Sequence, residues 1–363
     1  MQIDMHYYGT YAMAAAAGIP RDDAEIVAHA SQYVDDQDHE ELRSVRTVNG
    51  DTCEAVIGIA TAHSPYDISA DVGLMKSVIN KLTRHPMNST ADDSRLVWVP
   101  FHFLPGGGNG KYLERIMCKR DSQIAQEMID HHIKQKDEKF NLQLLGIAAH
   151  VYADTFSHFG FSGTTSSLNQ VEKDTISLDG HTSSKMQEML WNVSERIKTG
   201  FANNSGLGHG GVDTLPDMPF LKWEFEHALG YVDKRDNTVN FLEACRRLHD
   251  HFTCFANEKG YSTPRISFDE IASTVENILC YEGDNYERSD QWKVAMKNGH
   301  LGPVELCKDY NSRSWTEELI GAMENRNATS ITSSSAYLFH TAAEYHRHYV
   351  LKRLLPAHQV IVA

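Results

Sequence analysis

The chain has 363 residues, of which 41% are hydrophobic and 23% are charged, and its formal net charge is -15. This length suffices for one large domain with a deep core, and the composition excludes a disordered chain and a membrane protein. The six cysteines form no Cys-x-x-Cys pair, which excludes a disulfide scaffold and a cysteine zinc ribbon, and the acidic balance disfavours nucleic acid as a partner.

The start of the chain lacks the features of a targeting signal. The sequence MQIDMHYYGTYAMAAAAG places an acidic residue and a histidine before a short apolar stretch, with no basic segment in front of it. No apolar run approaches the length of a transmembrane helix. We therefore expect a cytoplasmic protein without an integral membrane segment, or a secreted one if the chain is a trimmed mature form. The sequence does not predict the oligomeric state.

Hydrophobic periodicity predicts a mainly helical chain. Helices are expected over residues 5–17, 22–35, 111–137, 141–158, 183–199, 221–231, 237–258, 267–281 and 334–355. Residues 53–62 and 95–104 are short and apolar, as is typical of strands or extended segments. Loops are expected at residues 105–110, 162–183 and 200–220. Because no internal repeat or long polar linker divides the chain, we predict a single all-α domain over residues 1–363, mainly helical with few short strands.

The predicted helix over residues 141–158 carries the strongest chemical signal. Its sequence LLGIAAHVYADTFSHFG places His150, Asp154 and His158 four residues apart, so that they share one face of a helix whose other faces are apolar. Histidine is the commonest metal ligand, and the chain holds 20, roughly twice the usual share. Buried polar side chains must find partners, and metal ligation provides them directly. The alternative is that the three side chains only bond to one another.

One helix cannot supply all the ligands of two or three ions, so further ligands are expected from other segments. Asp4 and His6 lie at the start of the chain, and Asp35 and Asp36 end a predicted helix. The remaining candidates follow apolar segments or lie in a loop rich in Gly and Pro, and they are His63, His102, His209, Asp213 and Asp217. Each of these residues has the alternative of an ordinary surface or core position.

The segment LLGIAAHVYADTFSHFGF resembles the central metal helix of the zinc-dependent phospholipase C family, most closely the branch with the N-terminal domain of glycosylphosphatidylinositol-specific phospholipase D. The family pattern His-x3-Asp-x3-His-x2-Gly is matched by His150, Asp154 and His158, with Gly160 one residue early. The wider group includes the P1-type nucleases. The sequence is also similar overall to a bacterial family of unknown function that shares the opening HYYGTYAMA.

The resemblance extends to the order of the other ligands. The early family histidine corresponds to His6, the acidic residue that ends the next helix to Asp35 or Asp36, and the histidine after an aromatic residue to His102. The family normally closes its site with a later His-x3-Glu pair, and none stands at the expected place after His158; His340 and Glu344 have this spacing only on the last predicted helix, beside basic residues that suggest an exposed face. His209 with Asp213 or Asp217 is a substitute in a loop.

The resemblance implies a helical domain of the phospholipase C/P1 nuclease type that holds two or three Zn²⁺ ions or other divalent cations. It implies phosphoester hydrolysis by a metal-activated water, with Asp154 bridging ions and His150 and His158 on different ions. We assign catalysis to Asp154 and Asp36 and substrate binding to Tyr7, His63 and Asp217. The metal ligands are expected to be His6, Asp35, Asp36, His102, His150, Asp154, His158 and His209.

The acidic charge favours a lipid or another small phosphoester over nucleic acid as the substrate. Two other functions remain open. A P1-type nuclease would need aromatic side chains beside the metals, and Tyr7, Tyr8 and Trp223 are candidates. A non-catalytic protein would keep one structural metal ion or none.

Overall fold

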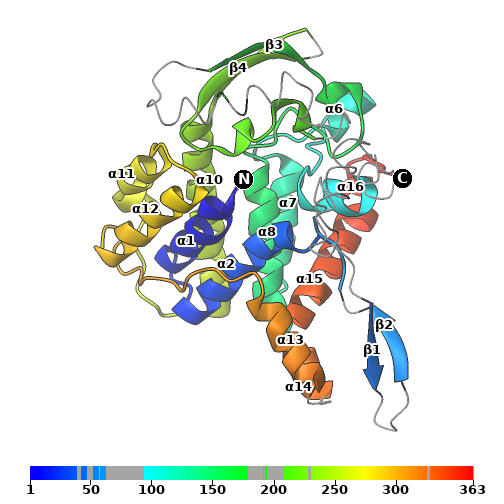
Figure 1. Cartoon of the computed structure of the whole chain (residues 1–363), viewed down its shortest axis with the longest axis vertical. Helices are drawn as coiled ribbons and strands as arrows, with labels where there is room; N and C mark the ends of the chain where they lie inside the picture. The colour runs from blue at the N-terminus through cyan, green and yellow to red at the C-terminus, as the bar shows by residue number, and fades with distance from the viewer. Residues whose placement is uncertain are drawn as a thin grey trace, which may run out of the picture.

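The helix that carries His150 and Asp154 lies in the interior of a mainly helical fold, between other helices (Figure 1). The computed structural model describes residues 1–38, 42–46, 52–56, 58–62, 94–178, 191, 193, 208–227, 230–324 and 328–362. No helix within these ranges is both long and apolar enough to span a membrane.

The α-helices are α1 (Thr10–Ala16), α2 (Arg21–Asp36), α5 (Val99–Phe101), α6 (Tyr112–Ile116), α7 (Gln123–Ile133), α8 (Asn141–Asp154), α10 (Asn237–Lys259), α11 (Phe268–Leu279), α12 (Asn285–Lys297), α13 (Ser314–Glu324), α14 (Ala328–Ser333), α15 (Ser335–Tyr349) and α16 (Leu355–Ala357). Shorter π-helical turns are η1 (Asp4–Gly9), η3 (Ser94–Trp98) and η7 (Val350–Leu354), and 3-10 turns are η4 (Ser167–Asn169), η5 (Gly210–Val212) and η6 (Leu215–Asp217).

Two small antiparallel sheets accompany the helices. Strands β1 (Leu42–Arg46) and β2 (Thr52–Val56) form a hairpin. Strands β3 (Val171–Leu178), β4 (Lys222–His227) and β5 (Val232–Asp236) form a second sheet in the order β3-β4-β5. Its inner face covers a hydrophobic cluster that includes Phe161 and Phe225 and is separate from the main helical core.

Helix α8 is buried on nearly all sides because its sequence is apolar around the whole helix. Leu144, Leu145, Ile147 and Val151 have no solvent exposure, and α2, α7, α10 and α15 pack against the helix. A helix that is hydrophobic all round belongs in the core of a protein. The polar side chains of α8 are therefore removed from water together with the apolar ones.

A glycine allows α2 to lie directly against α8. A Cβ atom at Gly146 would stand 2.3 Å from the carbonyl oxygen of Val27 and 2.6 Å from the Cβ of Ala30. Both distances are far below van der Waals contact, so only glycine permits this approach. The approach brings the end of α2, with Asp35, beside the polar residues of α8.

The structure confirms the mainly helical class and several predicted helices. The predicted helices over residues 5–17, 22–35, 237–258 and 267–281 correspond to η1 with α1, α2, α10 and α11, and the predicted C-terminal helix corresponds to α15 with the turns after it. Helices α12 and α13 were not predicted. Most of the predicted helix over residues 183–199 lies outside the described residues.

Four segments differ from the prediction. Residues 95–104 form η3 and α5 rather than a strand. Residues 111–137 form two helices, because residue Cys118 between them pairs its backbone with Pro105 and Phe161. Within the predicted helix over residues 221–231, Lys222–His227 form strand β4 instead, since Trp223, Phe225 and His227 alternate with exposed or half-buried residues. Part of the predicted loop 162–183 is β3.

We predict that Gly146→Ala lowers the free energy of unfolding by about 1–3 kcal/mol, because the added methyl group forces two helix backbones apart. Urea unfolding followed by circular dichroism measures this. The control is Gly321→Ala in α13, where an added Cβ meets no atom within 4 Å. There the better helix propensity of alanine should stabilise the protein by about 0.5–1 kcal/mol. Equal effects of the two substitutions would contradict the close approach of α2 and α8.

Candidate metal centre

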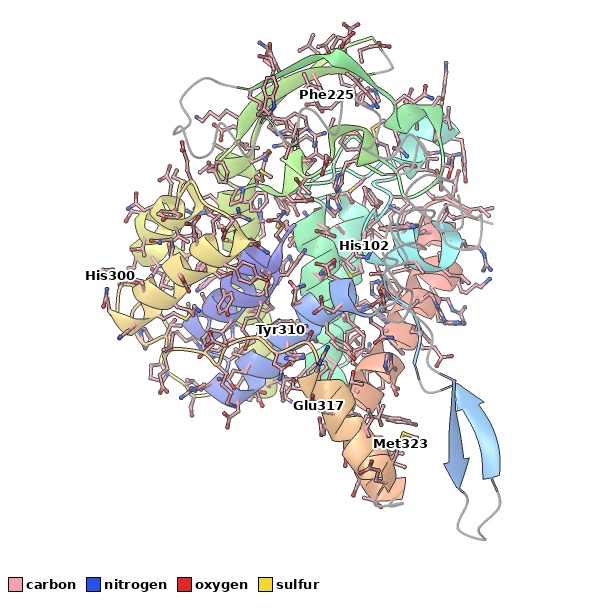
Figure 2. All side chains as sticks on the ribbon, in the orientation of Figure 1. His102, Phe225, His300, Tyr310, Glu317 and Met323 are labelled. Carbon is pink, nitrogen blue, oxygen red and sulfur yellow. The ribbon has the colours of Figure 1, made fainter. Side chains whose placement is uncertain are left out.

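Eight acidic and histidine side chains from six segments converge beside α8. They form three groups in which the nearest side-chain nitrogen and oxygen atoms lie within 4.8 Å of one another. The groups are His6 with His150 and Asp154, Asp35 with His102 and His150, and His158 with His209 and Asp217. His102, which follows α5, lies in the interior of the fold (Figure 2). Residues up to 211 positions apart in the chain thus meet at one place.

Asp154 lies at the middle of the first two groups. Its two carboxylate oxygens stand 3.2 Å from His6 Nε2 and 3.2 Å from His150 Nε2, and His102 Nδ1 is 3.5 Å away. Asp35 approaches the same histidines from α2, at 3.8 Å from His150 Nε2 and 3.9 Å from His102 Nδ1. The carboxylate of Asp154 therefore faces imidazole rings from three different segments.

The third group extends the centre beyond the end of α8. His158 follows the helix, but its backbone amide still donates to the carbonyl of Asp154 at 2.8 Å, which keeps its ring next to that residue. His158 Nε2 is 3.2 Å from Asp217 Oδ1, and His209 Nε2 is 3.6 Å from Asp217 Oδ2. Phe103 stacks on the His158 ring at 4.7 Å. His209 and Asp217 are held by the 3-10 turns η5 and η6.

Backbone carbonyl groups orient four of the five histidines. His102 Nε2 faces the carbonyl of Thr61 at 2.8 Å, and His150 Nδ1 faces that of Ser31 at 2.8 Å. His158 Nδ1 lies 2.9 Å from a carbonyl oxygen and His209 Nδ1 lies 2.8 Å from another. A carbonyl oxygen only accepts, so these nitrogens carry the hydrogen. In the neutral rings the other nitrogen then presents a lone pair to the centre, as in histidines that bind metals.

Several atoms of the centre lack the partners that buried polar groups require. His150 Nε2 and His102 Nδ1 face each other at 3.3 Å, although both present lone pairs when the rings are neutral. Neither ring nitrogen of His6 makes a hydrogen bond, and neither does Oδ2 of Asp154, although these atoms are buried. Buried polar atoms are almost always paired. Bound cations would give a partner to one nitrogen of His6, to Asp154 Oδ2 and to the facing nitrogens of His150 and His102.

Asp154 and Asp217 are strongly stabilised as anions despite their burial, because neighbouring histidines and the Met1 ammonium group lower their pKa values. Burial alone would raise the pKa of Asp154, but His158, the Met1 ammonium group and His150 outweigh burial and hold this pKa well below its usual range. The ammonium group lies 2.8 Å from Asp154 Oδ1 and 3.1 Å from Asp217 Oδ1. Burial, together with the neighbouring His150, lowers the pKa of His6 to about 4. The centre therefore combines anionic carboxylates with imidazoles such as His6 that stay neutral near pH 7.

The structure brings together most of the residues expected from the sequence, and it corrects two of them. Asp36 is exposed, and its carboxylate accepts hydrogen bonds from Tyr310 and from Gln32, so it is not part of the centre. Tyr7 is buried, and its hydroxyl donates to the carbonyl of Lys308 at 3.0 Å rather than facing a substrate. His63 lies outside the described residues.

Two expectations from the sequence concern Asp217, as a substrate-binding residue and as a loop substitute for the family's later ligand pair. It was assigned to substrate binding, but its carboxylate faces the nitrogens of His158 and His209 as a ligand would. The sequence signal for this role was weak, because a loop with Gly and Pro gives no fixed spacing between two ligands. Tyr8 and Trp223, named for a nuclease, are buried, and the Trp223 indole donates to Asn237 at 3.2 Å.

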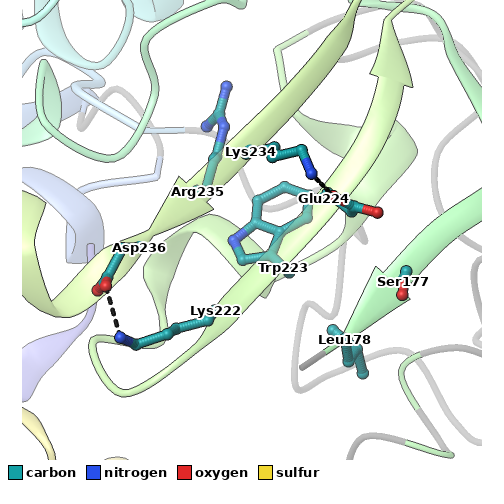
Figure 3. Close-up of a pocket in the computed structure, with 8 residues that line it drawn as sticks. All are labelled: Ser177, Leu178, Lys222, Trp223, Glu224, Lys234, Arg235 and Asp236. Atoms are coloured by element: carbon teal, nitrogen blue, oxygen red, sulfur yellow. Dashed lines mark ion pairs between the residues drawn. The ribbon is translucent and has the colours of Figure 1, made fainter. Parts of the chain in front are cut away.

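A surface cavity of about 440 Å³ lies over β4 and β5 (Figure 3). Charged side chains that line the cavity form ion pairs with one another, with Lys222 2.7 Å from Asp236 and Lys234 2.9 Å from Glu224. None of the eight converging residues lines it. The chemistry of the candidate centre is thus separate from this cavity.

Buried arginines hold two of the segments that carry the centre. Arg288 of α12 donates from Nε to Asp4 Oδ2 at 2.7 Å, and both side chains are 2% exposed. Asp4 is two residues before His6, so the pair fixes the turn that presents His6. Arg235 of β5 donates to the carbonyl of Ser157 at 3.0 Å, next to His158.

We predict that Arg288→Met lowers the free energy of unfolding by about 3–5 kcal/mol, because Asp4 remains buried without its partner. Chemical denaturation measures this. Replacing both residues, as Arg288→Met with Asp4→Leu, should recover much of the loss. Arg246→Met, which removes an exposed pair with Asp269, serves as the control and should change stability by less than about 1 kcal/mol. A small effect of Arg288→Met alone would contradict the role of the buried pair.

An aromatic cluster beside the centre encloses a further histidine. The His29 ring stacks on Trp315 at 4.1 Å and lies 4.8 Å from the ring of Tyr310. Its Nε2 is buried without a hydrogen-bond partner, and burial lowers the pKa of His29 to about 3. The folded protein therefore keeps this ring neutral at pH values where the unfolded chain protonates it.

Since the unfolded chain binds this proton below about pH 6.5 and the folded protein does not, the free energy of unfolding must fall as the pH is lowered. We predict that His29→Phe removes this contribution. Between pH 6.5 and pH 4.5 the variant should lose about 2 kcal/mol less stability than the unsubstituted protein. Urea titrations of both proteins at both pH values measure this difference. The contributions of the other titrating groups are the same in the two proteins and cancel in the comparison. Parallel pH profiles would show that His29 is protonated in the folded protein.

Comparisons with known proteins give a family but no activity. The model of a family of unknown function (DUF6765) matches residues 1–354. No curated protein and no solved structure matches the chain significantly. The family description names neither a metal nor a reaction, so the chemistry rests on the residues of the centre.

Proposed function

The chain belongs to the DUF6765 family of unknown function, and we propose that it is a metal-dependent hydrolase of phosphoesters. The observation that carries this proposal is the convergence of five histidines and three aspartates. Among them, the ring nitrogens of His6 and Oδ2 of Asp154 are buried without hydrogen-bond partners, and His150 Nε2 faces His102 Nδ1. Imidazole nitrogen and carboxylate oxygen are the donors that Zn²⁺ takes in catalytic sites. The residues of the centre therefore fit divalent cations.

Each group of the centre would hold one ion, which gives two or three ions per chain. His150 belongs to two groups, and Asp154 faces His6 with one oxygen and His150 with the other, so these residues would link neighbouring ions. Bound there, divalent cations lower the pKa of water towards neutrality and neutralise a phosphoryl group. Two ions about 4 Å apart are the usual arrangement for the hydrolysis of phosphoesters.

The exposure of the eight residues indicates the side from which a substrate would enter. His6, His150 and Asp154 are at most 1% exposed at their side chains, whereas Asp35 is 31% exposed and His209 is 17% exposed. Asp35 is thus the carboxylate that meets solvent and substrate. Its position beside His150 and His102 allows it to orient a water molecule and to accept a proton from it.

The substrate is proposed to be a lipid phosphoester or another small phosphoester. The net charge of -15 repels a polyanion over most of the surface, so a long nucleic acid is a poor fit. Tyr7 and Tyr8 are occupied in packing, and Trp223 lines the cavity over β4 and β5, which none of the eight converging residues lines. None of the three therefore offers a base a stacking surface beside the proposed ions. These observations favour the smaller substrates over the nuclease alternative.

We predict that the purified protein holds two or three divalent ions per chain and that Asp154→Asn loses most of them. Removal of the central carboxylate should also lower kcat/KM by more than about 100-fold. Loss of a residue that hydrogen-bonds to a metal ligand already lowers activity by about 10–100-fold, and loss of the ligand itself should lower it at least as much. Mass spectrometry of the metals measures the first effect. Hydrolysis of phosphatidylcholine, of single-stranded DNA and of a generic phosphodiester measures the second and separates the substrate classes.

The matched control is Asp36→Asn, at the neighbour of Asp35 that lies outside the centre. It should keep both metal content and activity. An unchanged helical circular dichroism signal establishes that Asp154→Asn is folded. One ion or none in the unsubstituted protein would contradict the hydrolase, and full activity of Asp154→Asn would refute the role of that carboxylate.

A further inference from the structure

Two segments that are far apart in the sequence meet at the surface around α6. The hydroxyl of Tyr112 donates to the carbonyl of Ile361, and Arg115 Nη1 donates to the carbonyl of Gln359 at 3.1 Å. Figure 1 shows α6, α16 and the C-terminal end on the same side of the molecule. We call this contact region the α6 surface, and it comprises Lys111, Tyr112, Leu113, Arg115, Lys119 and Ile361.

The α6 surface exposes three large apolar side chains. Tyr112 is 45% exposed, Leu113 is 46% exposed and Ile361 is 67% exposed. Single exposed apolar residues are normal on a soluble protein, but a group of them at one contact marks an interaction site. Leu113 and Ile361 have no polar atoms in their side chains, so water is a poor environment for both.

The charge of the α6 surface is opposite to that of the whole chain. Lys111 is exposed, and Arg115 and Lys119 are half-buried beside it. The acidic side chains in this region are Glu114 and also Glu127, which forms an ion pair with His358 at 2.8 Å. The chain as a whole carries a net charge of -15. A large anionic surface therefore repels most of the protein and orients it with this basic region towards the surface.

We propose that the α6 surface attaches the protein to an anionic lipid bilayer. Leu113, Tyr112 and Ile361 enter the interface between headgroups and acyl chains, while Lys111 and Arg115 contact lipid phosphates. A tyrosine between aliphatic and basic side chains is the usual composition of a segment that lies in this interface.

Two other kinds of partner fit the α6 surface less well. The phosphates of a nucleic acid attract basic side chains, but contact with them does not stabilise exposed aliphatic side chains. A protein partner usually covers about 800 Å² on each side, and three apolar side chains supply only a small part of this area. A lipid surface accepts isolated apolar side chains one by one, which matches what the α6 surface offers.

The attachment is independent of the proposed hydrolase and is measured without turnover. The full-length protein is sedimented with vesicles of phosphatidylcholine alone and with vesicles that contain one quarter phosphatidylglycerol. We expect binding at least tenfold stronger to the anionic vesicles at low salt and its loss at high salt, because the attraction is partly electrostatic. Binding that is absent, or equal on the two kinds of vesicle, would overturn the proposal.

Variants separate the two parts of the α6 surface. Lys111→Glu should weaken binding to anionic vesicles by at least about fivefold, the effect of a single basic residue near such a surface. Leu113→Ser with Ile361→Ser should weaken it further at the same ionic strength.

The control removes two exposed apolar side chains from α12, as Tyr286→Ser with Val294→Ser, which are 74% and 50% exposed in the unsubstituted protein. It should bind vesicles like the unsubstituted protein. Equal loss in the control, or binding to heparin that is as strong as binding to anionic vesicles and unaffected by Leu113→Ser, would overturn attachment to lipid at the α6 surface.

Discussion

The candidate centre depends on one arrangement: imidazole rings that are held by backbone carbonyls so that their second nitrogens face buried carboxylates. The carbonyls of Ser31 and Thr61 fix His150 and His102 in this way. Each carbonyl determines both the tautomer and the direction of the ring. The Met1 ammonium group compensates part of the negative charge of Asp154 and Asp217, and bound cations, as proposed, would compensate the rest.

The rest of the fold positions this arrangement. Gly146 lets α2 contact α8 closely enough for the Ser31 carbonyl to meet His150. Arg288 holds Asp4, and thereby the turn that carries His6. Arg235 holds the turn after α8, where His158 lies. Elements from both halves of the chain are therefore needed before the centre exists, so the proposed metal binding would be coupled to the stability of the whole fold.

Much of the centre was accessible from the sequence because one helix repeats a polar residue every four positions within an apolar surrounding. That pattern predicted His150, Asp154 and His158 correctly as neighbours, and order along the chain added His6, Asp35 and His102. The choice between Asp35 and Asp36 was not accessible, because adjacent residues at a helix end point in directions about 100° apart and only packing decides which one faces inward. Asp36 turns to Tyr310, a residue 274 positions away.

The sequence by itself determined the mainly helical class and the polar face of α8, since both follow from periodicities that are local in the chain. Only the tertiary structure decided that β4 and β5 form a hairpin over the turn that carries His158, and that the loop residues His209 and Asp217 complete the third group. Contacts between distant segments depend on how side chains fill the space between helices. No local pattern encodes them, and it is these contacts that bring the eight residues to one place.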